Sequence, residues 1–273
     1  MTDLASQVQS DLVYYVYAVA RPHDPQQTVL LPTAGIIPQS PVYAVPWRDL
    51  VAMTSAVPLA DFGAEALPVK LEDLDWTCAR VLAHQETLAQ LMVNYTIVPL
   101  KFCTLYTTED RVRDMVETHY AELDRALERL YGATEWGIKV YCDRRILAEW
   151  VERAAPEVQV LRSSMANKSE GAAFFIRKRL EKLVTTVAEH TVDPCLSDSY
   201  ERLRQHARET CINQVQAQNA AENQPELVAN VAYLVDNTAY TGFTTALDQL
   251  VETYTEQGFR YELTGPWPPY NFA

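Results

Sequence analysis

The sequence predicts an α+β protein built from two α+β domains, the second of them ferredoxin-like. Segments rich in β-branched and aromatic residues are interspersed with longer segments whose apolar residues recur at helical spacing. After residue 133 the pattern restarts and follows β-α-β-β-α-β with helical insertions, the ferredoxin-like order, with helices on one face of an antiparallel sheet. We therefore expect an N-terminal domain over residues 1–133 and a C-terminal domain over residues 134–273.

The first predicted strand covers residues 13–19, where valine, tyrosine and alanine dominate. The proline-rich residues 21–41 are predicted to be a loop, and residues 42–56 to hold two short strands. Residues 96–104 form the next predicted strand. Pro99 within it favours an edge position or a bulge, because proline has no N–H to donate to a sheet.

Two helices are predicted in the same domain. The first runs from about residue 71 to residue 93, and its apolar stripe is expected to face the core. That stripe consists of Leu71, Leu74, Cys78, Val81, Leu82, Leu88 and Met92. The second helix begins at Thr107, with Asp110 three residues on, and ends near Gly132. His119 falls on its apolar stripe, so we expect a partly buried, hydrogen-bonded side chain there.

The second domain begins with an alternating strand at residues 136–142. A helix ended by Gly258 and a final alternating strand are predicted near its end. The further predicted elements are helices at 145–153, 169–190, 197–208 and 243–254, strands at 211–217, 227–235 and 259–263, and a polar loop at 219–225.

Composition and charge limit the classes of function. The formal net charge of −13 disfavours binding to nucleic acid, since phosphate backbones are repelled. The five cysteines are odd in number and widely spaced, which is typical of reduced thiols in a cytosol. No signal peptide precedes the first strand, and the apolar run at residues 12–20 is far shorter than the ~18 residues of a membrane span. We expect a cytoplasmic protein without a membrane partner.

Motifs for catalysis, cofactors or metals are not evident. The eight glycines are scattered rather than gathered in a phosphate-binding loop. His84 is followed by Gln85 and Glu86 but by no second histidine four residues on, so a zinc site of the H-E-x-x-H type is not predicted. A structural or surface histidine is the main expectation for His84, with a partner contact or a catalytic base as alternatives. We expect no catalytic, cofactor-binding or metal-binding residues and no enzyme.

The most distinctive segment is the C-terminal run 265–272, Gly-Pro-Trp-Pro-Pro-Tyr-Asn-Phe. Its three prolines predict an extended segment close to polyproline II, with about three residues per turn. That spacing places Trp267 and Tyr270 on the same side. The segment is expected either to fold back as a strap over its own domain or to grip a partner.

With this tail included, the chain resembles the GvpF/GvpL family of gas vesicle proteins over nearly its whole length. The motifs that carry the resemblance are residues 15–19, Trp76 with 84–86, 98–102, 135–140, 171–175 and 263–272. Two positions depart from the family pattern. The family usually shows glycine where this chain has Cys103, and glycine is common at the position of Ala18.

The resemblance implies an accessory part in building gas vesicles, protein shells whose wall is mostly one small, very hydrophobic subunit, GvpA. It implies two α+β domains, binding to GvpA and to other accessory proteins, location at the gas vesicle in the cytoplasm, and no cofactor. A permanent place in the shell is the first alternative. A regulatory module for a small ligand and an enzyme of unrecognised type are the others.

Candidate partner-binding residues follow from the motifs and the tail. Large aromatic side chains on stiff backbone lose little entropy when they dock. The candidates are Trp76, His84, Phe102, Trp267 and Tyr270.

Overall fold

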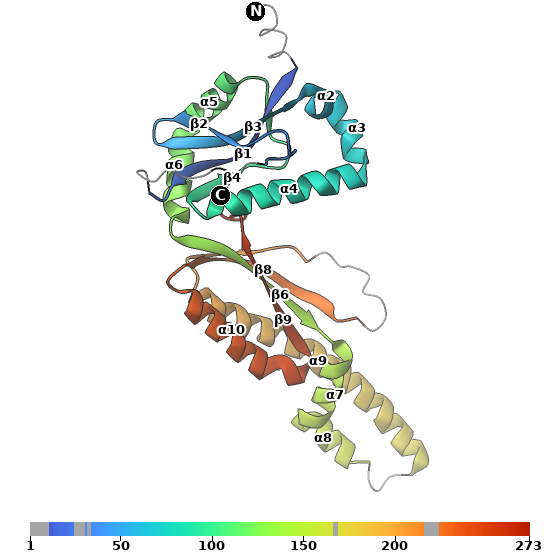
Figure 1. Cartoon of the computed structure of the whole chain (residues 1–273). Coiled ribbons are helices and arrows are strands. Elements are labelled where there is room, and N and C mark those ends of the chain that lie inside the picture. Colours follow the sequence, from blue (N-terminus) through green and yellow to red (C-terminus); the bar gives the residue numbers. More distant parts are fainter. Residues whose placement is uncertain (1–10, 25–30, 32–33, 166–168, 216–223) are drawn as a thin grey trace, which may run out of the picture. The chain divides into compact units, whose positions relative to one another are not determined.

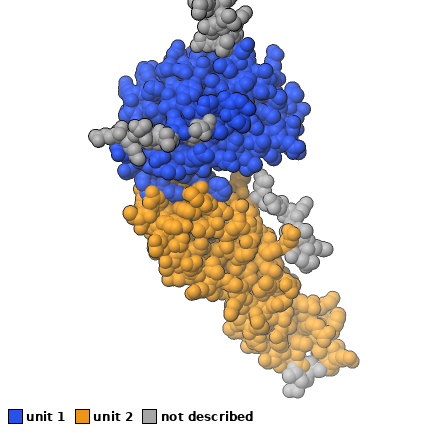
Figure 2. All heavy atoms as spheres, viewed as in Figure 1, with its two compact units in different colours: residues 1–134, 267–273 blue, residues 135–266 orange. Residues whose placement is uncertain are grey.

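The computed structural model describes two compact units (Figures 1 and 2). Described residues are 11–24, 31, 34–165, 169–215 and 224–273. Unit 1 comprises residues 1–134 together with 267–273, and unit 2 comprises residues 135–266. The C-terminal tail, which we expected within the second domain, therefore belongs to unit 1.

The sheet of unit 1 has the strand order β2-β3-β1-β4, with β5 pairing β1 as well. Its strands are β1 (Leu12–Pro22), β2 (Tyr43–Trp47), β3 (Leu50–Pro58), β4 (Tyr95–Pro99) and β5 (Leu105–Tyr106). The predicted strands in 13–19, 42–56 and 96–104 are thus present, the last as β4 only. Pro99 ends an edge strand, as its missing N–H indicated.

Strand β1 is the centre of unit 1. Every residue from Val13 to Ala20 is buried, so both faces of the strand are covered. Its register with β3 shifts between Val16 and Ala18, which leaves Tyr17 as the extra residue of a β-bulge. The backbone N–H of Ile36 and the hydroxyl of Ser55 both lie within hydrogen-bond distance of the Tyr17 hydroxyl, at 2.6 Å and 3.0 Å.

Helices α2 (Leu59–Phe62), α3 (Ala66–Glu72) and α4 (Leu74–Met92) follow β3 (Figure 1). We predicted one helix from residue 71, but the chain breaks at Asp73. The backbone of Asp73 is extended, and its carboxylate accepts hydrogen bonds from the N–H groups of Asp75 and Trp76, which caps α4.

The next predicted helix is likewise two helices, α5 (Glu109–Thr118) and α6 (Tyr120–Leu130). Its cap is Thr108 rather than Thr107, with the Thr108 hydroxyl accepting from the N–H of Arg111 at 3.2 Å. His119 lies at the break between α5 and α6 and is exposed beside Glu122, so our expectation of a partly buried histidine was wrong.

Unit 2 contains a sheet of strand order β7-β8-β6-β9. Its elements are β6 (Ala133–Cys142), α7 (Arg144–Ala154), α8 (Pro156–Ser163), α9 (Glu170–Arg204), β7 (Glu209–Ile212), β8 (Glu226–Asp236), α10 (Tyr240–Tyr254), the short 3-10 helix η1 (Thr255–Gln257) and β9 (Phe259–Trp267). The described elements follow β-α-β-β-α-β, with three helices in the first connection. The ferredoxin-like assignment itself stays a prediction.

Several predictions for unit 2 need correction. Helix α9 is continuous over 35 residues and passes through Pro194, where we expected a gap between two helices. Helix α8 lies between the predicted helices at 145–153 and 169–190, where we predicted no helix. Strand β7 ends at Ile212, and most of the predicted polar loop at 219–225 lies outside the described residues.

The two departures from the family pattern both lie where the backbone is irregular. Ala18 adjoins the bulge of β1, and Cys103 has a left-handed φ of 62°. A side chain in that region costs about 1–2 kcal/mol, which glycine avoids. The N–H of Cys103 donates to the Tyr15 hydroxyl at 3.1 Å, so the strained turn is part of the core of unit 1.

We predict that Cys103→Gly is more stable than Cys103→Ala by about 1 kcal/mol, because both lose the thiol but only alanine keeps the left-handed strain. Chemical denaturation of the two variants measures this difference. Equal stabilities would show that the turn relaxes and that φ at residue 103 is not constrained.

Candidate partner-binding site

A series of hydrogen bonds, buried at Tyr15 and His84 and partly exposed at Tyr270, joins β1, α4 and the tail in unit 1. The hydroxyl of Tyr15 lies 2.8 Å from Nδ1 of His84, and Nε2 of His84 lies 2.8 Å from the hydroxyl of Tyr270. His84 is only 1% exposed. The Tyr270 hydroxyl also donates to the carbonyl of Leu100 at 3.4 Å.

The hydrogen bonds at the two ends of this series, from Cys103 and to Leu100, determine which atoms donate in the two bonds of His84. The Tyr15 oxygen already accepts from the N–H of Cys103, so its own proton is available for Nδ1 of His84. Nε2 then carries the ring proton and donates it to Tyr270, whose proton goes to Leu100. In this arrangement every donor has an acceptor, and His84 is neutral with its proton on Nε2.

Aromatic rings enclose the histidine. The Tyr17 ring stacks on it at 5.9 Å between centroids, and the Phe102 ring meets it edge-on at 5.9 Å. This enclosure removes water from the imidazole and lowers the pKa of His84 to about 4. Burial also raises the pKa of the Tyr270 hydroxyl to about 12, and it raises the pKa of the Tyr15 hydroxyl well above its ordinary value. All three groups are neutral at pH 7, which suits a structural chain rather than proton transfer.

The tail turns where we expected it to be extended. Strand β9 continues to Trp267, and Pro266 is tolerated in it because β9 is an edge strand. The N–H of Tyr270 then donates to the carbonyl of Pro268 at 2.7 Å, and the N–H of Phe272 to that of Pro269 at 3.1 Å. The polyproline II prediction was therefore wrong for this segment.

Buried groups anchor the tail at several points. Pro268, Pro269 and Phe272 are buried, and the carbonyl of Phe272 accepts from the guanidinium of Arg129. Trp267 remains 44% exposed. The tail is thus a strap over unit 1 that leaves Trp267 and part of Tyr270 at the surface.

The face that α4 buries matches the predicted one only in part, because Leu88 of the predicted stripe is buried and Met92 packs against the core. The residues it buries are His84, Thr87, Leu88 and Leu91. The predicted core residues Leu74 and Leu82 are 76% and 63% exposed. On the buried face, His84 accepts the proton of the Tyr15 hydroxyl, which also accepts a hydrogen bond from the N–H of Cys103.

Three of the five predicted partner-binding residues lie together. His84, Phe102 and Tyr270 form one cluster, whereas the ring of Trp76 packs against Phe62 at 5.5 Å. Trp267 lies on the tail three residues before Tyr270.

The prediction missed Tyr15 and Tyr17, both fully buried. Their signal was present in the sequence, since tyrosines at alternate positions of an otherwise apolar strand need buried hydrogen-bond partners.

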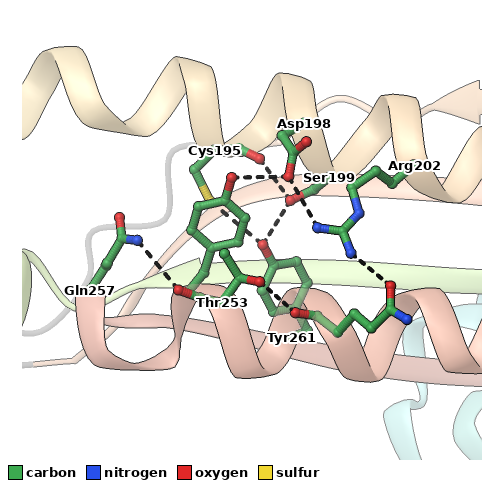
Figure 3. Close-up of polar contacts among 9 residues, drawn as sticks. Cys195, Asp198, Ser199, Arg202, Thr253, Gln257 and Tyr261 are labelled. Carbon is green, nitrogen blue, oxygen red and sulfur yellow. Dashed lines mark hydrogen bonds and ion pairs between the residues drawn. The ribbon is translucent and has the colours of Figure 1, made fainter.

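A second polar cluster ties α9 to α10 and β9 in unit 2 (Figure 3). The hydroxyl of Ser199 lies 2.7 Å from that of Tyr261 and donates to the carbonyl of Cys195 at 2.7 Å. The hydroxyl of Tyr254 donates to Asp198. Because the Ser199 proton is directed into the helix backbone and no histidine joins the cluster, it has the character of a structural clamp rather than a nucleophilic site.

Metal-binding groups and membrane-spanning helices are both absent from the part of the chain that the structure describes. There, no group of three or more histidine, cysteine or acidic side chains is arranged to hold a metal ion. Within the same residues no helix has both the length and the apolar character needed to cross a membrane.

The fold and these clusters define a two-unit α+β protein whose two polar clusters are held by internal hydrogen bonds. A family model described as "Gas vesicle synthesis protein GvpL/GvpF" matches residues 13–273. The chain therefore belongs to the GvpL/GvpF family of gas vesicle proteins, as the motifs indicated. This family is one of gas vesicle proteins and not a known family of enzymes.

Individual relatives agree with this assignment. Gas vesicle protein L of Streptomyces sp. (strain CB03234) is 33% identical over 97% of this chain and 94% of its own length. Gas vesicle protein F of the same strain is 26% identical over 95% of this chain and 98% of its own length. The crystal structure of GvpF from Anabaena sp. PCC7120 superposes with a TM-score of 0.68 at 16% identity, covering 97% of this chain and 98% of that one. At that identity the superposition establishes the shared fold.

The depressed pKa of His84 predicts a loss of stability in acid. Between pH 6.5 and 4 the unfolded chain protonates this histidine while the folded chain does not, so the free energy of unfolding falls by about 3 kcal/mol as the pH drops through this range. Chemical denaturation at each pH measures the fall in the wild type and in His84→Gln, which keeps an N–H donor near Nε2 but cannot titrate. Parallel pH profiles for the two proteins would contradict the buried, neutral histidine.

Proposed function

We propose that this protein binds the hydrophobic wall subunit GvpA and assists gas vesicle assembly, as a minor component or chaperone-like partner. It acts by binding and not by catalysis, in the cytoplasm and at the forming vesicle. Family membership supports the vesicle context. The net charge of −13 supports a holding role, because an acidic partner that covers apolar surface keeps the pair in solution.

The observation that carries the proposal is the anchored tail with its exposed tryptophan. Trp267 is 44% exposed, while the residues after it are fixed by the Tyr270–His84 bond and by the buried Phe272. A large aromatic on backbone that is already ordered gains contact area without a further entropy loss, which is the physical basis of binding hot spots.

The five predicted residues then take different parts. Trp267 and Tyr270, the latter 40% exposed, are proposed to contact the partner. His84 is buried and positions Tyr270 through its hydrogen bond. Phe102 packs on the His84 ring. Trp76, near the start of α4, packs on Phe62 of α2.

We predict that Trp267→Ala weakens co-purification with tagged GvpA at least tenfold, since truncating an aromatic hot spot costs about 2 kcal/mol or more. Tyr131→Ala is the matched control, because Tyr131 is also an exposed aromatic of unit 1, at 60%. The affinity of each variant for GvpA and its thermal stability are measured together. If a folded Trp267→Ala protein binds GvpA as strongly as the wild type, the tail is not part of the binding site. If the wild type does not bind GvpA, the proposed function is refuted.

A further inference from the structure

The outward side of α3 and α4 is apolar. We call the outer face the four residues Leu74, Cys78, Val81 and Leu82 of α4, all of them exposed, and Val69 and Leu71 of α3 are exposed as well. Val69 is 67% exposed and Leu74 is 76% exposed. Single exposed apolar residues are ordinary, but a contiguous group marks an interaction site.

Helical spacing makes the outer face continuous. Leu74, Cys78 and Leu82 succeed one another at intervals of four residues along α4, with Val81 beside them. Such a row is a ridge of the kind that packs into the groove of a second helix. The only charged residues that α4 exposes are Asp75 and Glu86.

The charges around the outer face are acidic. Glu65, Glu72, Asp75 and Glu86 are exposed. The nearby bases are engaged: Lys70 pairs with Asp61 at 2.8 Å, and the guanidinium of Arg80 lies over the ring of Trp76. An apolar strip with a negative rim is complementary to an apolar helix flanked by lysine or arginine.

Strand addition to unit 1 is less well supported. The edge strand β2 packs against α5, and the edge strand β4 packs against α6. A helix lying on the outer face therefore fits unit 1 better than a strand at its sheet edge. A second copy of this chain is disfavoured as the occupant, because two acidic rims would face each other.

We propose that the outer face binds an amphipathic helix of the wall subunit, one whose apolar side is flanked by basic residues. This inference rests on the proposed function and adds the surface and the chemistry of the segment it takes. The orientation of α4, with His84 turned inward, leaves this surface exposed.

The test compares two double variants of the full chain in co-purification with tagged GvpA. Leu74→Gln/Leu82→Gln alters the outer face at exposed positions and is expected to lower binding at least tenfold with an unchanged melting temperature. Val160→Gln/Ile212→Gln alters residues of unit 2 that are 72% and 69% exposed, and is expected to bind as the wild type does. If the wild type binds and both double variants bind equally well, the outer face is not the site although the proposed function stands. If the wild type does not bind, the proposed function fails first.

Two further measurements test the chemistry. Cys78 is an exposed thiol on the outer face, so maleimide labelling of Cys78 should slow at least tenfold when GvpA is bound. Glu72→Lys/Glu86→Lys should weaken binding at low salt, and the difference from the wild type should shrink at high salt. Unchanged labelling, or stronger binding by the lysine variant, overturns the proposal. So does a Leu74→Gln/Leu82→Gln variant that converts a dimer of this chain into a monomer, since the face would then be occupied by a second copy.

Discussion

The hydrogen bonds of one buried histidine determine much of unit 1. Strand β1 is covered on both faces and places the Tyr15 hydroxyl in the core, where an unpaired polar group costs about 1–3 kcal/mol. His84 satisfies that hydroxyl through Nδ1 and, through Nε2, binds Tyr270 of the tail. The strand, the helix and the C-terminal segment, which are far apart in the sequence, thus share one chain of polar contacts.

The orientation of α4 follows from this constraint. Helix α4 turns His84, Thr87 and Leu88 inward, while Leu74 and Leu82 are exposed. Exposed leucines promote aggregation, and the acidic rim together with the net charge of −13 opposes it. The same arrangement that completes the core therefore leaves an apolar surface, and the anchored tail leaves Trp267 exposed. In a family of gas vesicle proteins, both features suit a partner with a large apolar surface.

The fold class and most strands were predictable because β1, β4, β6 and β9 are marked by local composition. The buried face of α4 was not fully predictable from the sequence. The spacing of leucines carries no information about the hydrogen bond between His84 and a tyrosine of another element. Pro194 misled the prediction because tertiary packing in unit 2 carries α9 through a residue that would end an isolated helix. Three of the predicted partner-binding residues, His84, Phe102 and Tyr270, lie together, but the link from Tyr15 to Tyr270 spans most of the chain and has no local signal.

The most direct test of the central claim is a nitrogen-15 NMR titration of the His84 ring in the full chain. The account predicts a neutral ring at pH 7 with its proton on Nε2, and a pKa near 4. A pKa near the ordinary value of 6.5, with the two tautomers in rapid exchange, would mean that His84 is solvated. In that case His84 would determine neither the anchoring of the tail nor the orientation of α4.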